Sequence, residues 1–192
     1  MHDQPLLNST GVHESYRTRT IVQLETDNGL KGIGETGGNQ VDVIESNRDW
    51  VIGCDPANIN MARLKFNGSP TAWSALEFGL LDAAARNAEL PLCDYLGGRA
   101  RDSVEWSAYL FYKFADENGV GEVAAGSALD PEGFLKQTQE FVDRYGFKEL
   151  KIKGGYFHPD VDIETFRLLR KHFPREEGYE IRIDPNAVWT VE

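Results

Sequence analysis

The first half of the chain begins with a strand-like alternation of hydrophobic and polar residues, which then changes to a helical period. Residues 18–26 and 30–35 are β-prone runs on either side of Asp27-Asn28-Gly29. An Asn-Gly pair between two such runs predicts a β-hairpin. Shorter helical patterns follow over 41–50 and 59–66.

A longer helix is predicted after Ser69 and Pro70, because serine suits the N-cap and proline suits the first turn. Pro91 ends this helix. Its apolar residues recur on one face, at Trp73, Leu76, Leu80, Leu81 and Ala84. A hairpin followed by helices predicts a separate α+β module. The polar segment 1–16 that precedes it is predicted to be a loop.

The second half alternates strands and helices in the order β, α, β, α, β. The predicted strands are 104–111, the run ELKIK at 149–153, and 180–183. The first helix is predicted to begin with a cap at Asp130-Pro131 and to end at Gly146, with an inner face of Phe134, Phe141, Val142 and Tyr145. The second helix is predicted to end at Pro174, with an inner face of Ile163, Phe166, Leu169 and Phe173. Residues 116–128 are predicted to be a loop. This order predicts a parallel sheet with right-handed crossovers.

Composition narrows the class of partner. The 192 residues contain 41% hydrophobic residues, enough to bury a core, and carry a formal net charge of −11. This acidity argues against nucleic acid and anionic membranes as partners. We find neither an apolar run of membrane-spanning length nor a signal-like start, so a cytoplasmic location is predicted. Cys54 and Cys93 lack the spacing of a zinc site or a disulfide framework and are predicted to be reduced packing residues.

Two lysines form the first candidate for chemistry. Lys151 and Lys153 lie on the same face of their predicted strand, because side chains alternate along a strand. Repulsion between the two ammonium groups, together with burial, predicts a lowered pKa for at least one of them and hence an amine that can accept a proton. A solvated strand edge is the alternative.

Polar residues also end the next strand. Asp184 and Asn186 flank Pro185, and a carboxylate at that place suits Mg²⁺ while an amide suits an oxygen-rich substrate. An ordinary Asp-Pro turn is the alternative. The presence of both pairs at the ends of successive parallel strands favours an active site, because β/α barrels carry their catalytic groups at that face.

A glycine pattern suggests a different class of site. Gly32, Gly34 and Gly37 match the GxGxxG pattern of dinucleotide-binding folds. A hairpin strand precedes them, and no βαβ unit with a suitably placed ribose-binding acid follows. We therefore interpret them as turn and close-packing residues.

Taken together, these motifs resemble the enolase superfamily in its mandelate racemase-like branch. KIKGG followed by RIDPNAVW is similar to the second and third barrel strands of that branch. GVHESYRTRTIVQLETDNGLKGIGETGG and WSAYLFYK resemble glucarate dehydratases most. The resemblance implies an α/β protein with an α+β capping domain over 1–99 and the first three strands of a truncated (β/α) TIM-type barrel over 100–192, joined at Gly97-Gly98-Arg99.

The resemblance also implies roles for residues that composition leaves neutral. His13 lies in a segment similar to the family's mobile loop, Ser74 falls where these enzymes place a substrate-binding hydroxyl, and Tyr109 resembles a substrate-contacting tyrosine. Without the resemblance, these three are better explained as a surface histidine, a small helix residue and a half-buried strand aromatic.

In the reaction that the resemblance implies, a proton leaves the carbon next to a carboxylate of an aldaric acid, and the neighbouring hydroxyl departs as water. Lys153 would be the base, the charge of Lys151 would face the substrate carboxylate, and Asn186 would hydrogen-bond the substrate. Asp184 would hold Mg²⁺, which would supply positive charge. The family's other metal ligands and its His-Asp dyad belong to later strands.

Three strands leave a barrel open, so the sequence predicts a truncated chain. Three hypotheses follow: a piece of a glucarate dehydratase-like enzyme, completed by a second chain or left incomplete; another acid-sugar dehydratase, a racemase or a cycloisomerase of the superfamily; and a non-catalytic remnant. A homo-oligomer is compatible with each. We expect the chain alone to bind Mg²⁺ weakly and not to turn over glucarate.

Overall fold

A computed structural model of the chain describes residues 5–13, 16–115 and 126–190. The chain forms two compact units, Arg17–Asp102 and the combination of Met1–Tyr16 with Ser103–Glu192. Sequence analysis placed the first sixteen residues with the first half of the chain. In the structure they belong with the second half, because a strand within them pairs with a strand of that half.

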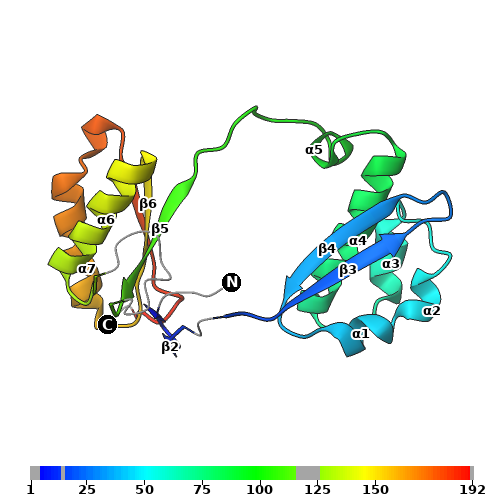
Figure 1. Cartoon of the computed structure of the whole chain (residues 1–192), viewed down its shortest axis with the longest axis horizontal. Helices are drawn as coiled ribbons and strands as arrows, with labels where there is room; N and C mark the ends of the chain where they lie inside the picture. The colour runs from blue at the N-terminus through cyan, green and yellow to red at the C-terminus, as the bar shows by residue number, and fades with distance from the viewer. Residues whose placement is uncertain (1–4, 14–15, 116–125, 191–192) are drawn as a thin grey trace. The chain divides into compact units, whose positions relative to one another are not determined.

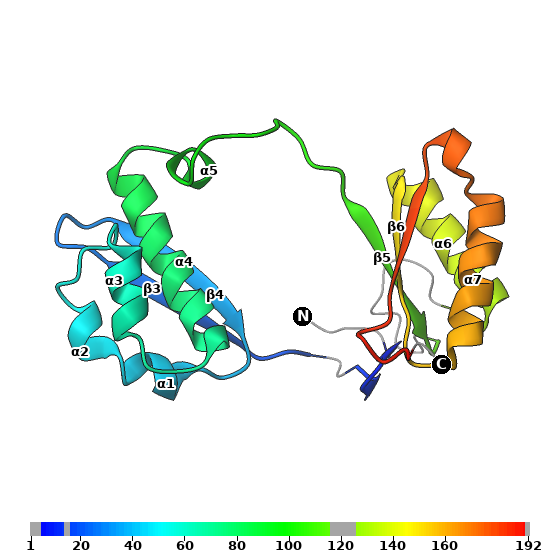
Figure 2. The same ribbon diagram turned by 180° about the vertical axis from the view of Figure 1, so that it is seen from behind.

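The unit Arg17–Asp102 is built on a β-hairpin, as predicted. Strands β3 (Arg19–Glu25) and β4 (Lys31–Gly37) pair antiparallel over their whole length. Gly29 has a φ of 81°, which the turn between them requires and which glycine adopts without strain. The helix α4 (Pro70–Asn87) lies across one face of the hairpin (Figures 1 and 2). The predicted N-cap is confirmed, since the Ser69 hydroxyl accepts a hydrogen bond from the Ala72 amide.

Two of the three pattern glycines lie where α4 meets β4. A Cβ at Gly32 would overlap the carbonyl oxygen of Gly79, and a Cβ at Gly34 would overlap that of Ala75. A Cβ at Gly37 would have its nearest neighbour 3.8 Å away. Gly32 and Gly34 therefore serve close helix-on-strand packing, which confirms that part of the interpretation.

Short helices complete this unit. They are α1 (Val41–Glu45), α2 (Arg48–Val51), α3 (Ile59–Lys65) and α5 (Leu92–Tyr95). The helix predicted over 41–50 is interrupted at Asn47, whose buried side chain donates to the Val43 carbonyl and accepts from the Trp50 indole. Cys54 packs against the core of the unit, whereas Cys93 is exposed and not the packing residue that was predicted.

The other unit is a five-stranded sheet in the order β2-β1-β5-β6-β7. Its parallel part consists of β5 (Ser107–Lys113), β6 (Glu149–Lys153) and β7 (Glu180–Asp184). The connections α6 (Pro131–Tyr145) and α7 (Pro159–His172), with the 3₁₀ turn η1 (Arg175–Glu177), confirm the predicted β, α, β, α, β order. Most of the loop predicted over 116–128 lies outside the described residues.

The N-terminal segment corrects one prediction. Residues expected to form a loop instead contain β1 (Leu6–Asn8) and β2 (Gly11–Val12), which pair as a short hairpin. β1 also pairs antiparallel with β5, through Leu6↔Lys113 and Leu7↔Tyr112. This pairing satisfies backbone groups along part of the β5 edge, which a three-stranded parallel sheet would leave open.

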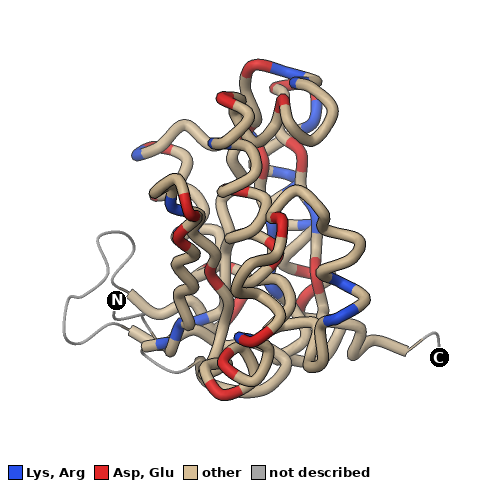
Figure 3. Tube along the Cα trace, turned by 90° about the vertical axis from the view of Figure 1, so that its right-hand side faces the viewer, with Lys and Arg blue, Asp and Glu red and all other residues tan. Residues whose placement is uncertain are grey.

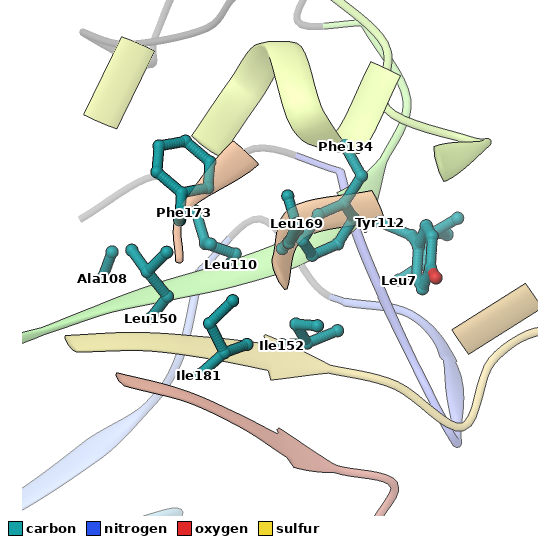
Figure 4. Close-up of a cluster of buried hydrophobic side chains, with 10 residues drawn as sticks. All are labelled: Leu7, Ala108, Leu110, Tyr112, Phe134, Leu150, Ile152, Leu169, Phe173 and Ile181. Atoms are coloured by element: carbon teal, nitrogen blue, oxygen red, sulfur yellow. The ribbon is translucent and has the colours of Figure 1, made fainter. Parts of the chain in front are cut away.

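Helices α6 and α7 cover one face of the parallel strands (Figure 1), and the core lies between them and the sheet (Figure 4). Its strand residues alternate, so Leu150 and Ile152 of β6 point into the core. Asp130 caps α6 by accepting from the Gly133 amide, and Gly146 ends it at a φ of 71°, both as predicted. Tyr145 was predicted to point inward but is half exposed, as the last residue of α6.

Acidic and basic positions are interspersed along the trace (Figure 3), with 31 Asp and Glu residues against 20 Lys and Arg residues. Within the part of the chain that the structure describes, every helix is too short or too polar to cross a membrane.

Candidate active site

The three parallel strands bring the predicted site residues together by their register. Tyr109 of β5 lies opposite Lys151 of β6, and Lys153 lies opposite Asp184 of β7. Side chains at paired positions of parallel strands project from the same face, so these four share the face opposite the helix-packed core. The sequence predicted that these groups would meet at the carboxyl ends of neighbouring strands, and the geometry agrees with it.

Asp184 is the centre of this group. Its Oδ2 atom lies 2.9 Å from Nζ of Lys151 and 2.9 Å from Nζ of Lys153. Its Oδ1 atom accepts a hydrogen bond of 3.1 Å from the backbone amide of Asn186. One carboxylate therefore lies between two ammonium groups, and the lysines do not face each other without a counter-charge.

This arrangement decides the protonation of the group. The hydrogen bonds from Lys153, Lys151 and the Asn186 amide hold the pKa of Asp184 far below its usual range. Burial alone would lower the pKa of Lys153, but the hydrogen bonds to Asp184 and Tyr109 outweigh it, and the pKa is raised. For Lys153 this direction is opposite to the one that sequence analysis predicted, because lysine repulsion was considered without the carboxylate on the next strand.

Asn186 completes the cluster from the segment after β7. Its Oδ1 atom accepts a hydrogen bond from Lys153 Nζ, and its Nδ2 atom donates to Ser9 Oγ at 2.9 Å. Asn186 has a φ of 53°, in the left-handed region that asparagine tolerates better than most residues. The backbone turn after Pro185 thus directs the amide side chain back towards the lysine.

Tyr109 supplies an aromatic surface beside the ammonium groups. Its ring centroid lies 4.6 Å from Lys151 Nζ and 5.9 Å from Lys153 Nζ, both within cation–π range. Tyr109 is 44% exposed as a residue, whereas Lys153 is only 7% exposed. Lys153 is thus the shielded amine of the pair, and Tyr109 forms an accessible wall beside it.

The other two predicted residues, His13 and Ser74, make the following contacts. His13 follows β2, and its backbone amide donates to the Leu6 carbonyl at 2.7 Å. Ser74 belongs to the unit Arg17–Asp102, where its hydroxyl donates to the Thr71 carbonyl at 2.8 Å. The roles assigned to these two residues stay predictions.

Sequence reasoning missed two residues that contact the cluster or its supporting turns. Ser9 accepts the hydrogen bond from Asn186, and its place follows from the pairing of β1 with β5. Asp162 is fully buried on α7 and accepts from the Gly155 amide at 2.8 Å. An acidic residue in the first turn of a helix carries no sequence signal of burial, because that position usually favours a solvated carboxylate.

A groove of about 850 Å³ lies elsewhere, in the unit Arg17–Asp102, between β3 and the helices α1 and α2. It is lined mainly by apolar and backbone groups and includes none of the predicted site residues. The convergence of charged groups on β6 and β7 is therefore the stronger candidate for chemistry.

The fit of a hard metal ion can be judged from the oxygen donors. Asp184 offers a carboxylate at the surface side of the cluster, and Asn186 adds an amide oxygen. Among the residues that the structure describes, no group of three His, Cys, Asp or Glu side chains is placed to hold a metal. The chain's residues fit part of an oxygen-ligand set, since Mg²⁺ in proteins is commonly held by one or two carboxylates with other oxygen ligands.

Comparison with protein families agrees with this geometry. Residues 3–97 match the mandelate racemase / muconate lactonizing enzyme N-terminal domain, and residues 133–192 match the enolase C-terminal domain-like family. The chain belongs to the mandelate racemase / muconate lactonizing enzyme family. Its α/β fold is that of the enolase superfamily, with capping-domain and barrel elements in the family order.

Individual relatives align with nearly the whole length of this chain. A probable glucarate dehydratase of Streptomyces coelicolor is 37% identical over 99% of the chain and 51% of its own length. Muconate cycloisomerase 1 of Pseudomonas putida is 31% identical over 98% of the chain and 51% of its own length. An enolase from Pseudomonas fluorescens, crystallised with bound magnesium, potassium and tartrate, is 34% identical with a TM-score of 0.82, over 98% of the chain and 50% of its own. The chain thus spans about half the length of the relatives it matches.

Proposed function

We propose that this chain is part of a glucarate dehydratase-like lyase and supplies the first half of its active site. The observation that carries the proposal is the pairing of Lys153 with Asp184 at the carboxyl ends of adjacent parallel strands. The 37% identity to a probable glucarate dehydratase supports the choice of substrate, as does the tartrate bound by a related enolase, because tartrate is also a hydroxylated diacid.

In this proposal, Lys153 removes the proton from the carbon next to a carboxylate of D-glucarate. The electron pair left by that proton expels the hydroxyl of the neighbouring carbon, which departs with a proton as water. The resulting enol rearranges to 5-dehydro-4-deoxy-D-glucarate. Lys153 must be neutral to act, so the charge of Asp184, which now raises its pKa, has to be offset when the complete site is assembled.

The other residues of the cluster orient the substrate. Lys151 directs its ammonium group to the substrate carboxylate, Asn186 donates or accepts a hydrogen bond to a substrate hydroxyl, and Tyr109 bounds the site beside both lysines. Asp184 is proposed as one ligand of Mg²⁺, which when bound would supply positive charge where negative charge develops on the substrate. His13 and Ser74 are proposed as further substrate contacts on the family resemblance.

A second candidate is another reaction of the same superfamily, that of another acid-sugar dehydratase, a racemase or a cycloisomerase. The 31% identity to muconate cycloisomerase 1 favours it, and a lysine beside a carboxylate could move a proton in each of these reactions. A non-catalytic fragment is the third candidate. Since one carboxylate makes a weak Mg²⁺ site, the chain alone is expected to bind Mg²⁺ weakly and to be inactive.

The test is glucarate dehydration by the purified chain with Mg²⁺, alone and mixed with the protein of the adjacent downstream reading frame. We expect activity in the mixture only. The Lys153→Met variant should lower that activity by at least about 10²-fold, while Lys136→Met, at an exposed position of α6, should leave it unchanged. Efficient dehydration by the chain alone would overturn the expected inactivity. Equal activity of wild type and Lys153→Met would overturn the role of the lysine, and turnover of muconate in place of glucarate would favour the second candidate.

A further inference from the structure

A buried carboxylate lies against the turn that follows β6, directly after Lys153 of the candidate active site. Asp162, in the first turn of α7, is 0% exposed. A buried carboxylate is costly unless hydrogen bonds satisfy it, so its partners indicate what it does. Its Oδ2 atom accepts a hydrogen bond of 2.8 Å from the backbone amide of Gly155, two residues after Lys153.

The backbone around this contact is packed too closely for any side chain. A Cβ at Gly154 would lie 2.5 Å from Asp162 Oδ2. Gly155 has a φ of 85°, and a Cβ there would lie 2.5 Å from the Pro185 carbonyl oxygen and 2.8 Å from Val188 Cγ2. The two glycines are therefore wedged between Asp162 on one side and the segment that follows Asp184 on the other.

The second oxygen of Asp162 has no hydrogen-bond partner among the residues that the structure describes. Within the described residues, Asp162 Oδ1 and the indole Nε1 of Trp189 are the buried side-chain atoms without a hydrogen-bond partner. Gly155, whose amide Asp162 binds, lies against Val188, the residue before Trp189. Burial raises the pKa of Asp162, and the Gly155 amide, the Tyr112 hydroxyl and the Trp189 indole act against that rise. The two unpartnered buried atoms are an acceptor and a donor, so they complement one another.

We propose that Asp162 is a positioning residue whose two oxygens hold the turn after Lys153 and the segment after Asp184 together. Oδ2 holds Gly155, and Oδ1 serves the Trp189 indole. Lys153 and Asp184 end the two strands from which these turns leave, and the Gly154 amide also donates to the Asp184 carbonyl at 3.2 Å. That Asp162 holds these two segments together does not depend on the proposed function. That it does so to keep Lys153 next to Asp184 and Asn186 for catalysis rests on the proposed function.

Substitutions separate the two oxygens. In Asp162→Asn, the amide oxygen can still accept from Gly155, but the amide NH₂ would face the indole N–H with a second donor. Asp162→Ala removes both contacts, and Trp189→Phe removes only the indole donor. Asp160→Asn is the matched control, because Asp160 is exposed two residues earlier in the same helical turn.

The readouts are NMR resonances of the isolated chain: amide exchange at Gly155, with Leu150 as the core reference, and the chemical shifts of the Asn186 amide and the Asp184 carboxyl. In Asp162→Ala, Gly155 exchange should rise by about tenfold relative to Leu150, and both shifts should move. Asp162→Asn should move the shifts with a smaller rise at Gly155. When Asp162→Asn is combined with Trp189→Phe, the chemical shifts should not move further than in Trp189→Phe alone, because the indole N–H that the asparagine amide would oppose is then absent.

Unchanged shifts at Asp184 and Asn186 in both Asp162 variants would overturn the proposal, as would a rise in exchange that is equal at Gly155 and Leu150. Additive effects of Asp162→Asn and Trp189→Phe would overturn the role of Oδ1. If Asp162→Ala does not fold, the Asn variant and its double mutant decide the question. None of these signals depends on turnover, so a mixture that fails to dehydrate glucarate overturns the proposed function and leaves this inference standing.

Discussion

Lys153 and Asp184 occupy paired positions on neighbouring parallel strands, and Lys153 Nζ lies 2.9 Å from the Asp184 carboxylate. Because Lys151 lies at the same distance from the same oxygen, the carboxylate is shared by two cations. This relationship sets the charge state of the cluster and is the basis of the first prediction.

Asp184→Asn should make stability less dependent on acid pH. The lysines lower the pKa of Asp184, so the ionised carboxylate stabilises the fold fully above its unfolded pKa of about 3.9, and this stabilisation is lost as pH falls towards the lower folded pKa. Thermal unfolding midpoints between about pH 6 and pH 2.5 measure it. The gap between wild type and variant should narrow below about pH 4.

Asp143→Asn, at an exposed position on α6, is the control for loss of a carboxylate in the same unit. Asp162 has the opposite effect on the pH dependence of stability. Because its pKa is raised in the folded state, its protonation as pH falls stabilises the native state relative to the unfolded state. Both variants retain Asp162, so its contribution cancels in the comparison. A constant gap between wild type and Asp184→Asn across the whole range would contradict the prediction.

Tyr109→Leu should destabilise the unit that contains the parallel strands β5, β6 and β7, whereas Tyr109→Phe should not. The ring lies 4.6 Å from Lys151 Nζ, and a phenylalanine keeps this cation–π contact while a leucine removes it. The expected loss for leucine is about 1 kcal/mol in the free energy of unfolding, measured in urea, against less than about 0.5 kcal/mol for phenylalanine. Equal losses would show that the phenolic hydroxyl or simple packing dominates.

Gly34→Ala should severely destabilise the unit Arg17–Asp102. The added methyl group would overlap the Ala75 carbonyl oxygen of α4, so the helix must move off the hairpin at a cost of about 3 kcal/mol or more. Gly37→Ala is the matched control, because its methyl group would meet its nearest neighbour at 3.8 Å. Circular dichroism during thermal unfolding distinguishes them; similar midpoints for the two variants would refute the close-packing role of Gly34.

Tyr112→Phe and Thr165→Val should show coupled losses of stability. Their hydroxyl oxygens are 2.8 Å apart in the core between β5 and α7, and each single change leaves one buried hydroxyl with a lost partner. Each should cost about 1 kcal/mol, and the double variant should cost less than the sum of the two. Chemical denaturation of the four proteins gives the coupling energy, and strict additivity would mean that the hydroxyls are not partners.

Local sequence patterns were sufficient for most elements and for the residues of the central cluster. The period-2 alternation around Asn28-Gly29 predicted the hairpin, and the caps at Ser69 and Asp130 predicted where α4 and α6 begin. Lys151 and Lys153 were placed on one face by the same alternation. These features depend on interactions between residues near one another in the chain, which the sequence encodes directly.

Several features that the sequence mispredicted or missed concern residues far apart in the chain. Residues Leu6–Asn8 form a strand because β5, about a hundred residues later, offers an edge to pair with. The pKa of Lys153 rises because Asp184, on the next strand, neutralises the repulsion of Lys151. Asp162 is buried against the turn after β6, where it accepts from the Gly155 amide and lies against Gly154.

The sequence by itself thus determined the order of strands and helices, the family resemblance and the identity of the residues that cluster around Asp184. The tertiary structure alone decided which charges neutralise one another, which edge the first strand covers and which carboxylate is buried beside the turn after Lys153. The physical reason is that propensity and periodicity act along the chain, whereas electrostatic and packing energies depend on distances in space that only the folded arrangement sets.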